Sequence, residues 1–151
     1  MAKQKRDVMP SEELLSEIHR NLVMGSENLC SVVPRIRNRH LLKEVTSQLE
    51  QYAAYTRTTA AMMKERAIRP KKSYPWKTVM VRGNIALNTM FDKSDSHIAE
   101  MISRGTRLGA DQLEKTVYRM RARGCHPDII AFGRNVVSFE RREAEDITRY
   151  R

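Results

Sequence analysis

The chain of 151 residues has few of the residue types that build specialised sites: two cysteines, four histidines, one tryptophan and 6% aromatic residues in all. No apolar run approaches the roughly 18 residues of a membrane-spanning helix, and the basic N-terminal segment lacks the apolar stretch of a secretory signal. Two cysteines cannot form a disulfide framework, and no Cys/His spacing indicates zinc. We therefore expect a cytoplasmic protein without a membrane segment.

The length and composition indicate one compact domain. Apolar residues make up 40% of the chain and charged residues 30%, a balance typical of long helices with a narrow buried stripe. The 28 Lys and Arg exceed the 18 Asp and Glu by ten, which gives a formal charge of +10. This excess fits an anionic partner or merely solubility, and charge alone does not decide between them.

Apolar residues at spacings of three and four predict two helices in the first half of the chain. The first begins at Pro10-Ser11-Glu12-Glu13, with Ser11 as N-cap, and ends near Pro34. The second follows the polar stretch 35–40 and ends before Pro70. Its predicted inner stripe is Leu42, Val45, Leu49, Tyr52, Ala53, Thr56, Ala60, Met63 and Ala67. A short connection makes the two helices antiparallel.

The stretch 76–120 contains no proline, and as one helix it would be about 67 Å long against about 40 Å for the first two. We therefore expect a break in the polar cluster 92–96, with a shorter helix over 76–91 and a long one over 96–121. The predicted inner side of the long helix is Ile98, Met101, Ile102, Gly105, Leu108, Gly109, Gln112, Thr116 and Met120.

Gly124 and Pro127 mark the end of one helix and the start of the last. The inner residues predicted for the last helix are Ile129, Ile130, Gly133, Val136, Val137, Glu140, Ala144 and Ile147. No segment alternates with period two, so the fold class is all-α. We expect a flexible basic arm over 1–10 and a single four-helix-bundle domain over 11–151. A crossover at about 70–92 makes the topology up-down-down-up.

The helix lengths and order, the Tyr52–Tyr55 region, the segment 102–107 and the segment Glu140–Ile147 resemble the ferritin-like superfamily. The resemblance is closest to small bacterial members of unknown function that carry a helix in the crossover. It implies a ferritin-like four-helix bundle.

The superfamily's usual site is a di-iron centre built from a Glu on each of two helices and a Glu-x-x-His on each of the others. This chain has no Glu-x-x-His. Glu27 and Glu50 fall off the inner stripes, and Ser103, Thr106 and Arg107 stand where related bundles are acidic. Only Glu140 falls clearly inside, with Glu143 at the edge. Glu140 is thus either a residual metal ligand or, as we favour, a core carboxylate bonded to an Arg, Gln112, Tyr52 or Thr56. We expect no cofactor and no catalytic residues.

The remaining special residues have structural interpretations. Gly105 and Gly109 form a small-x-x-x-small pair that lets another helix approach closely. The histidines are expected at the surface, and Cys30 is expected to pack within the first helix. In the predicted topology Cys30 and Cys125 lie at opposite ends of the bundle, too far apart for a disulfide.

The predicted topology gathers basic residues at one end of the bundle, which we name the basic pole. Its members are Lys64, Arg66, Arg69, Lys71, Lys72, Arg119, Arg121 and Arg123, with the N-terminal arm nearby. Such a surface would suit nucleic acid or an acidic protein, although the opposite end is also basic.

Three functions fit these observations. We favour a non-catalytic structural or protein-interaction module that forms a homo-oligomer or binds a protein partner. The first alternative is a nucleic-acid-associated protein that uses the basic pole. The second is a metal-binding ferritin-like oxidoreductase or iron-storage relative.

Overall fold

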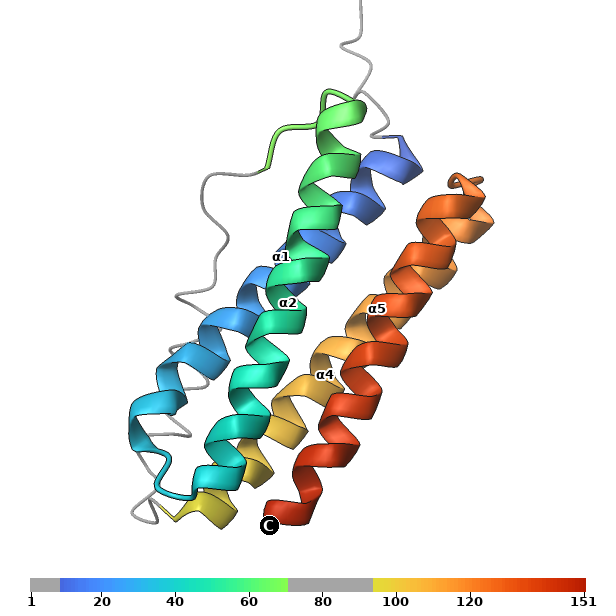
Figure 1. The fold of residues 1–151 in the computed structure, drawn as a ribbon. Coiled ribbons are helices and arrows are strands. Elements are labelled where there is room, and N and C mark those ends of the chain that lie inside the picture. Colours follow the sequence, from blue (N-terminus) through green and yellow to red (C-terminus); the bar gives the residue numbers. More distant parts are fainter. Residues whose placement is uncertain (1–8, 71–93) are drawn as a thin grey trace, which may run out of the picture.

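The computed structural model describes residues 9–70 and 94–151, which form four long helices (Figure 1). They are α1 (Pro10–Val32), α2 (Arg39–Glu65), α4 (Asp95–Ala122) and α5 (Pro127–Asp146). Two short 3₁₀ turns, η1 (Val33–Arg35) and η2 (Ile147–Tyr150), follow α1 and α5. No strand occurs in these two ranges, so the all-α four-helix bundle is confirmed. The helix predicted over 76–91 and the first eight residues of the predicted arm lie outside the described residues.

Hydrogen bonds at the two ends of the bundle establish the direction of each helix. At one end, the Asp95 carboxylate that opens α4 accepts from the backbone N–H of Arg37 at 2.9 Å and of Asn38 at 2.7 Å. At the other end, the Ser11 hydroxyl of α1 accepts from the backbone N–H of His126, just before α5, at 3.1 Å. Hence α2 and α4 run the same way and α1 and α5 the opposite way, the predicted up-down-down-up order.

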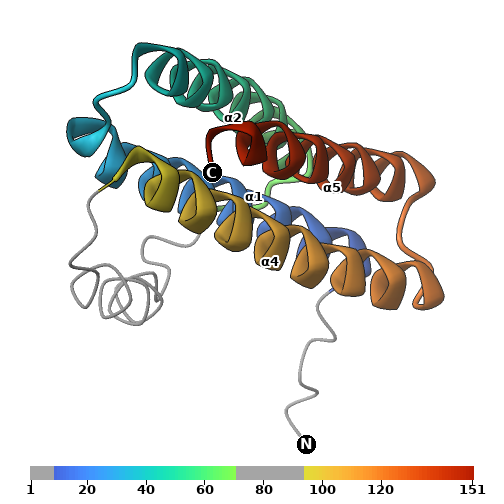
Figure 2. The same cartoon turned by 90° about the horizontal axis from the view of Figure 1, so that it is seen from below.

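The helices form two layers, with α1 and α4 in one and α2 and α5 in the other (Figure 2). Helix α1 packs against both α2 and α4, and α4 packs against α5. The apolar core lies between the layers and contains Leu14, Ile18 and Leu22 of α1 together with Val117 of α4 and Val136 of α5.

The structure confirms the predicted end of α4, whereas the predicted start of α1 differs from the observed one. Asn38 caps α2 and Ser94 caps α4, while Gly124, at φ +85°, ends α4 as predicted. The assignment of Ser11 as N-cap was wrong: the N-cap is Met9, two residues earlier, which makes no side-chain cap bond, and α1 begins at Pro10. Proline suits the first helical position because it has no N–H to satisfy, and Ser11 is thereby free to bond the turn before α5.

The buried face was predicted for α5 with the omission of Phe139, which is buried as well, and only partly for α2 and α4. Every inner residue predicted from 129 to 147 is buried. In α4, Leu108 was wrong, since it is 59% exposed, and Gly105 and Gln112 are exposed as well. At 3.6 residues per turn Leu108 falls opposite Val117, so its apolar character misled the assignment.

In α2 the buried stripe contains Leu41, Gln48 and Thr59 besides Val45, Tyr52 and Met63. Of the residues predicted to be inside, Ala53 and Ala60 are exposed, and Ala67 lies beyond the helix with φ 54°. The stripe was misplaced because the true one includes two polar residues that apolar periodicity does not register.

Within residues 9–70 and 94–151, no helix is long and apolar enough to span a bilayer.

Candidate functional site

The most unusual group in the core is the carboxylate of Glu140, on the inner face of α5. Its residue is 1% exposed, and its Oε2 accepts a hydrogen bond from the Tyr52 hydroxyl at 2.9 Å. Its Oε1 is buried without a hydrogen-bond partner. Of the bonding partners expected for Glu140 from the sequence, Tyr52 is therefore the one observed.

Tyr52 reaches Glu140 because α1 has no side chain in its path. A Cβ built on Gly25 of α1 would lie 2.6 Å from the Tyr52 Cε1 atom, so only glycine leaves room for the ring. The ring also meets Phe139 edge to face, with centroids 5.1 Å apart and planes at 74°. The tyrosine is thus fixed from both sides, with its hydroxyl directed at the carboxylate.

Helices α1 and α4 complete the polar cluster through Asn21 and Gly109. The Asn21 amide donates to the Gly109 carbonyl at 3.1 Å and also hydrogen-bonds the Glu140 carboxylate. A Cβ on Gly109 would lie 3.3 Å from Asn21 Oδ1 and 3.4 Å from Glu140 Oε2. Of the predicted close-packing glycine pair, Gly109 therefore has this role, whereas nothing lies within 4 Å of a Cβ on Gly105.

Burial dominates the electrostatics of this cluster. It raises the pKa of Glu140 to about 7, against the hydrogen bonds from Tyr52 and Asn21, which lower the pKa. Burial also raises the pKa of Tyr52 well above its usual value, and the negative charge of Glu140 raises it further. At neutral pH the phenol keeps its proton, and the carboxyl group is close to half protonated.

A second carboxylate, Glu143, lies half-buried on α5. Its pKa is raised to about 7, first by burial and then by the negative charges of Glu44 and Asp146. The buried Gln48 of α2 hydrogen-bonds this carboxylate and also donates to the Glu143 carbonyl at 3.4 Å. The sequence analysis missed both Gln48 and Asn21, because a lone amide on a helix gives no signal of what it faces.

The donors around Glu140 do not fit a dinuclear metal site. Such a site needs several carboxylates and imidazoles, and here the neighbours are a phenol and an amide. Ser103 on α4 instead donates to the Ala144 carbonyl at 2.9 Å, and Arg107 pairs with Glu145 at 3.2 Å. The described residues contain no group of three or more His, Cys, Asp or Glu able to hold a metal ion.

The cysteines differ from each other in burial. Cys125 is buried beside the start of α5, but Cys30 is exposed, so the prediction that it packs within the first helix was wrong. Both are free thiols. Cys30 lies near the C-terminal end of α1, whereas Cys125 lies beside Ser11 at the N-terminal end of the same helix. The two cysteines are therefore at opposite ends of the bundle, as expected.

The C-terminal ends of α2 and α4 lie at the same end of the bundle, where the described members of the basic pole are found. All six are exposed: Lys64, Arg66, Arg69, Arg119, Arg121 and Arg123. Arg123 pairs with Glu13 at 2.7 Å and Arg66 with Glu65 at 3.8 Å. Carboxylates therefore balance part of this positive charge. Lys71 and Lys72 lie outside the described residues.

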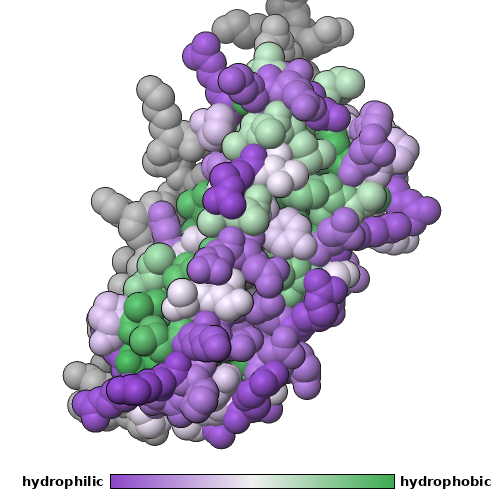
Figure 3. Space-filling model, viewed as in Figure 1, coloured by the Kyte–Doolittle hydropathy of each residue, from purple (hydrophilic) through white to green (hydrophobic). Residues whose placement is uncertain are grey.

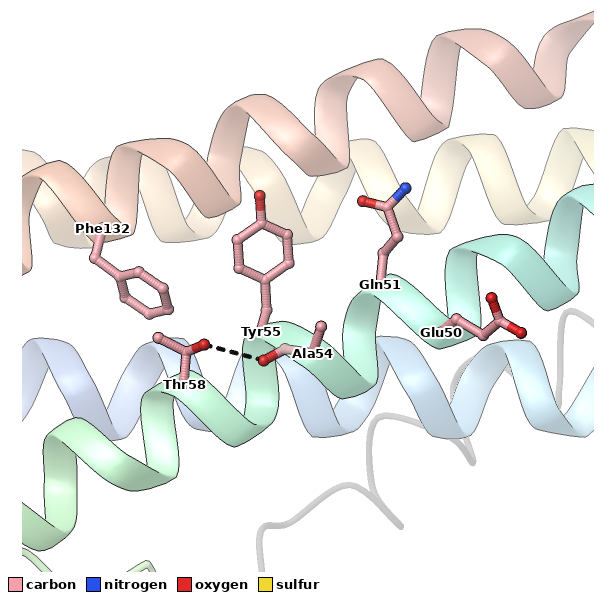
Figure 4. Close-up of a pocket in the computed structure, with 6 residues that line it drawn as sticks. All are labelled: Glu50, Gln51, Ala54, Tyr55, Thr58 and Phe132. Atoms are coloured by element: carbon pink, nitrogen blue, oxygen red, sulfur yellow. Dashed lines mark hydrogen bonds between the residues drawn. The ribbon is translucent and has the colours of Figure 1, made fainter.

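A shallow groove runs along the surface between α2 and α5 (Figure 4). Tyr55 extends from α2 toward α5, and Phe132 extends from α5 toward α2, with ring centroids 6.1 Å apart. The other lining residues, all from α2, are Glu50, Gln51, Ala54 and Thr58. The groove exists because aromatic rings, rather than close helix contacts, separate α2 from α5.

Comparison with known proteins supports the fold and leaves the function open. No protein-family model matches the sequence, and no curated protein matches it. Among solved structures, the chain is similar to "YcfI, a putative structural protein from Rhodopseudomonas palustris". The TM-score is 0.68 at 16% identity, with 95% of this chain and 96% of that chain covered. At that identity the likeness shows a shared helical-bundle fold and no more.

Proposed function

We propose that the chain is a non-catalytic, ferritin-like helical bundle that serves as a cytoplasmic structural or protein-interaction module. The observation that carries the proposal is the hydrogen-bonded cluster of Tyr52, Glu140, Asn21 and Gly109, one from each helix. These groups bond one another across the centre of the bundle. The cluster therefore acts as a structural tie between the four helices.

Two further observations support this role. The groups that bond the Glu140 carboxylate are a phenol and an amide, which form a polar contact between helices and are not the carboxylates and imidazoles of a dinuclear site. The similar solved structure is itself described as a structural protein.

Metal analysis of the full chain, purified without chelator, tests the proposal. We expect less than 0.1 equivalent of iron or manganese in the unaltered protein and in the variants Glu140→Gln and Glu143→Gln. Glu143→Gln is the matched control, because it removes a carboxylate from the same helix outside the cluster. Stoichiometric metal that Glu140→Gln abolishes and Glu143→Gln retains would overturn the proposal in favour of a metal-binding ferritin-like protein.

The second candidate function is nucleic-acid association through the basic pole. It is favoured by the exposure of Lys64, Arg66 and Arg69 at the end of α2, at the same end of the bundle as Arg119 and Arg121 of α4. Phosphates could be neutralised by these cations, and binding would weaken steeply with salt.

A titration with duplex and single-stranded DNA at two salt concentrations distinguishes this candidate. If it is correct, the double variant Lys64→Glu/Arg69→Glu should bind at least tenfold more weakly than the unaltered chain. The variant Lys43→Glu/Arg142→Glu, which makes the same charge change elsewhere, should bind almost normally. No binding at low salt, or an equal loss in both variants, would eliminate a role for the basic pole.

A further inference from the structure

The outward side of α2 differs from the rest of this basic molecule in having little charge. Over residues 46–61 the exposed positions contain only two charged residues, Glu50 and Arg57, whose charges cancel. The other exposed residues are Thr46, Ser47, Gln51, Ala53, Ala54, Thr58, Ala60 and Ala61. We name these ten residues the α2 face. Figure 3 shows pale green and white residues, interspersed with purple ones, over this part of α2.

The α2 face continues directly into the groove between α2 and α5. Glu50, Gln51, Ala54 and Thr58 belong to both, and the groove adds the partly buried rings of Tyr55 and Phe132. Apolar and aromatic surface next to small side chains allows another helix to approach closely and to bury area there.

The opposite charges of Glu50 and Arg57 can pair between two antiparallel copies of α2, but not within one copy. They are seven residues apart, about 10.5 Å along the helix, on the same outward side. Neither makes an ion pair or hydrogen bond with the described part of its own chain. Their midpoint falls between Ala53 and Ala54. A two-fold axis through this point would set Glu50 against the partner's Arg57, and Arg57 against the partner's Glu50.

We infer that two copies of this chain associate through the α2 face, with the two α2 helices antiparallel across Ala53 and Ala54. The inference rests on the proposed structural role and specifies its partner as a second copy. A net charge of +10 makes two copies repel, so a self-interface requires a region of low net charge with complementary ions. The α2 face meets both conditions. By contrast, the exposed side of α4 contains Arg104, Arg107, Lys115 and Arg119 against Asp111 and Glu114, so it is net positive.

Charge reversal in the full chain, with the mass measured by light scattering and by sedimentation velocity, tests the interface. The unaltered chain should be a dimer. In the single variant Glu50→Arg, both ion pairs across the axis become pairs of cations. In the single variant Arg57→Glu, both become pairs of carboxylates. Each single variant should dissociate at least tenfold more readily. The double variant Glu50→Arg/Arg57→Glu restores both pairs and should return to the dimer.

Mixing the two single variants gives a second, independent readout. One variant presents only cations and the other only carboxylates, so an equimolar mixture should form heterodimers that native mass spectrometry resolves by mass. Lys115→Glu on α4 is the control for net charge and should remain dimeric. Circular dichroism should show the same helical content for every variant.

The outcomes separate this interface from the proposed function. A monomeric unaltered chain, a dimer insensitive to both single reversals, or failure of the double variant to recover would overturn the α2 interface. Recruitment of DNA or of a different protein by this face, with no self-association, would overturn it too. The results on self-association do not affect the structural role, which the metal analysis and the DNA titration described above test separately.

Discussion

Helix α5 packs differently against its two neighbours, α4 and α2. Toward α4 the approach is close: a Cβ on Gly133 would lie 2.9 Å from Val117 Cγ2, and Ser103 bonds the Ala144 carbonyl. Toward α2 the contact runs through rings, with Tyr55 and Phe139 4.9 Å apart at their centroids. The first side has no room for added atoms, whereas the second leaves a groove at the surface.

The difference follows from residue size along one helix. Gly133 and Ala144 face α4 and permit backbone contact, while Phe132 and Phe139 face α2 and hold it away. Close backbone packing leaves no surface for a partner, and ring-mediated packing leaves some. We therefore assign close backbone packing to the α4 side and association to the α2 side, and four predictions test the packing of the bundle.

The largest effect is expected for Tyr52→Ala, which removes the fully buried ring between α2 and α5. Loss of the ring and of the hydrogen bond to Glu140 should lower the free energy of unfolding by about 4 kcal/mol. Urea unfolding followed by circular dichroism measures this. Tyr55→Ala, at the edge of the groove, should cost less than half as much. Equal losses would show that the α2 side is packed as tightly throughout as the α4 side.

Stability should depend on pH through Glu140. Its pKa of about 7 in the fold exceeds the ordinary 4.5, so the folded state binds more protons between these values. Stability should therefore fall as pH rises from about 4.5 to about 7 and then level off. Glu143 adds a smaller, solvent-screened change in the same direction.

The variant Glu140→Gln cannot ionise and should lack this part of the pH dependence. Relative to the unaltered chain it should gain about 3 kcal/mol between pH 4.5 and pH 8. Denaturant unfolding at four pH values measures the difference, with the exposed Glu145→Gln as control. Parallel pH profiles for Glu140→Gln and the unaltered chain would contradict our account of this carboxylate.

The close contact between α5 and α4 predicts a cost for a single methyl group. Gly133→Ala places a Cβ against Val117 and at 3.4 Å from Ile18 Cδ1, so these side chains must move. We expect a loss of about 2 kcal/mol, visible as a lower midpoint in thermal or urea unfolding. If the variant were as stable as the original, the contact would be looser than the structure shows.

The smallest effect should have the opposite sign. Gly105 lies on the exposed side of α4, and a Cβ at this position would have nothing within 4 Å, so Gly105→Ala should stabilise the helix by up to about 1 kcal/mol. The same unfolding experiment measures it. A loss of stability would indicate an unsuspected contact on that side of α4.

The comparison also shows where sequence patterns suffice. All the residues predicted on the inner face of α5 are buried, because apolar residues recur at every turn between Pro127 and Ile147, bounded by Gly124; the buried Phe139 was missed. The pairing of Glu140 with Tyr52 was among the predicted alternatives because both fell on inner stripes. Such patterns locate a residue on a helix, but they do not identify which group faces it.

The errors have the same origin. Gln48 and Asn21 are polar, so only the neighbouring helices reveal why they are inside. Leu108 is apolar yet 59% exposed, and Cys30 is exposed despite its usual preference for burial. At Leu108 the apolar side chain predicts burial, whereas its position opposite the buried Val117 on α4 predicts exposure, and the exposure is observed.

The contact between Asp95 and the backbone of Arg37 and Asn38 has a kinetic consequence. The hairpins α1–α2 and α4–α5 each close through nearby residues, whereas this contact joins positions 57 and 58 residues apart. Contacts so distant in sequence form late, since a long loop must close before they contribute. Hydrogen exchange at these two amides thus reports when the two hairpins dock, separately from the formation of either hairpin.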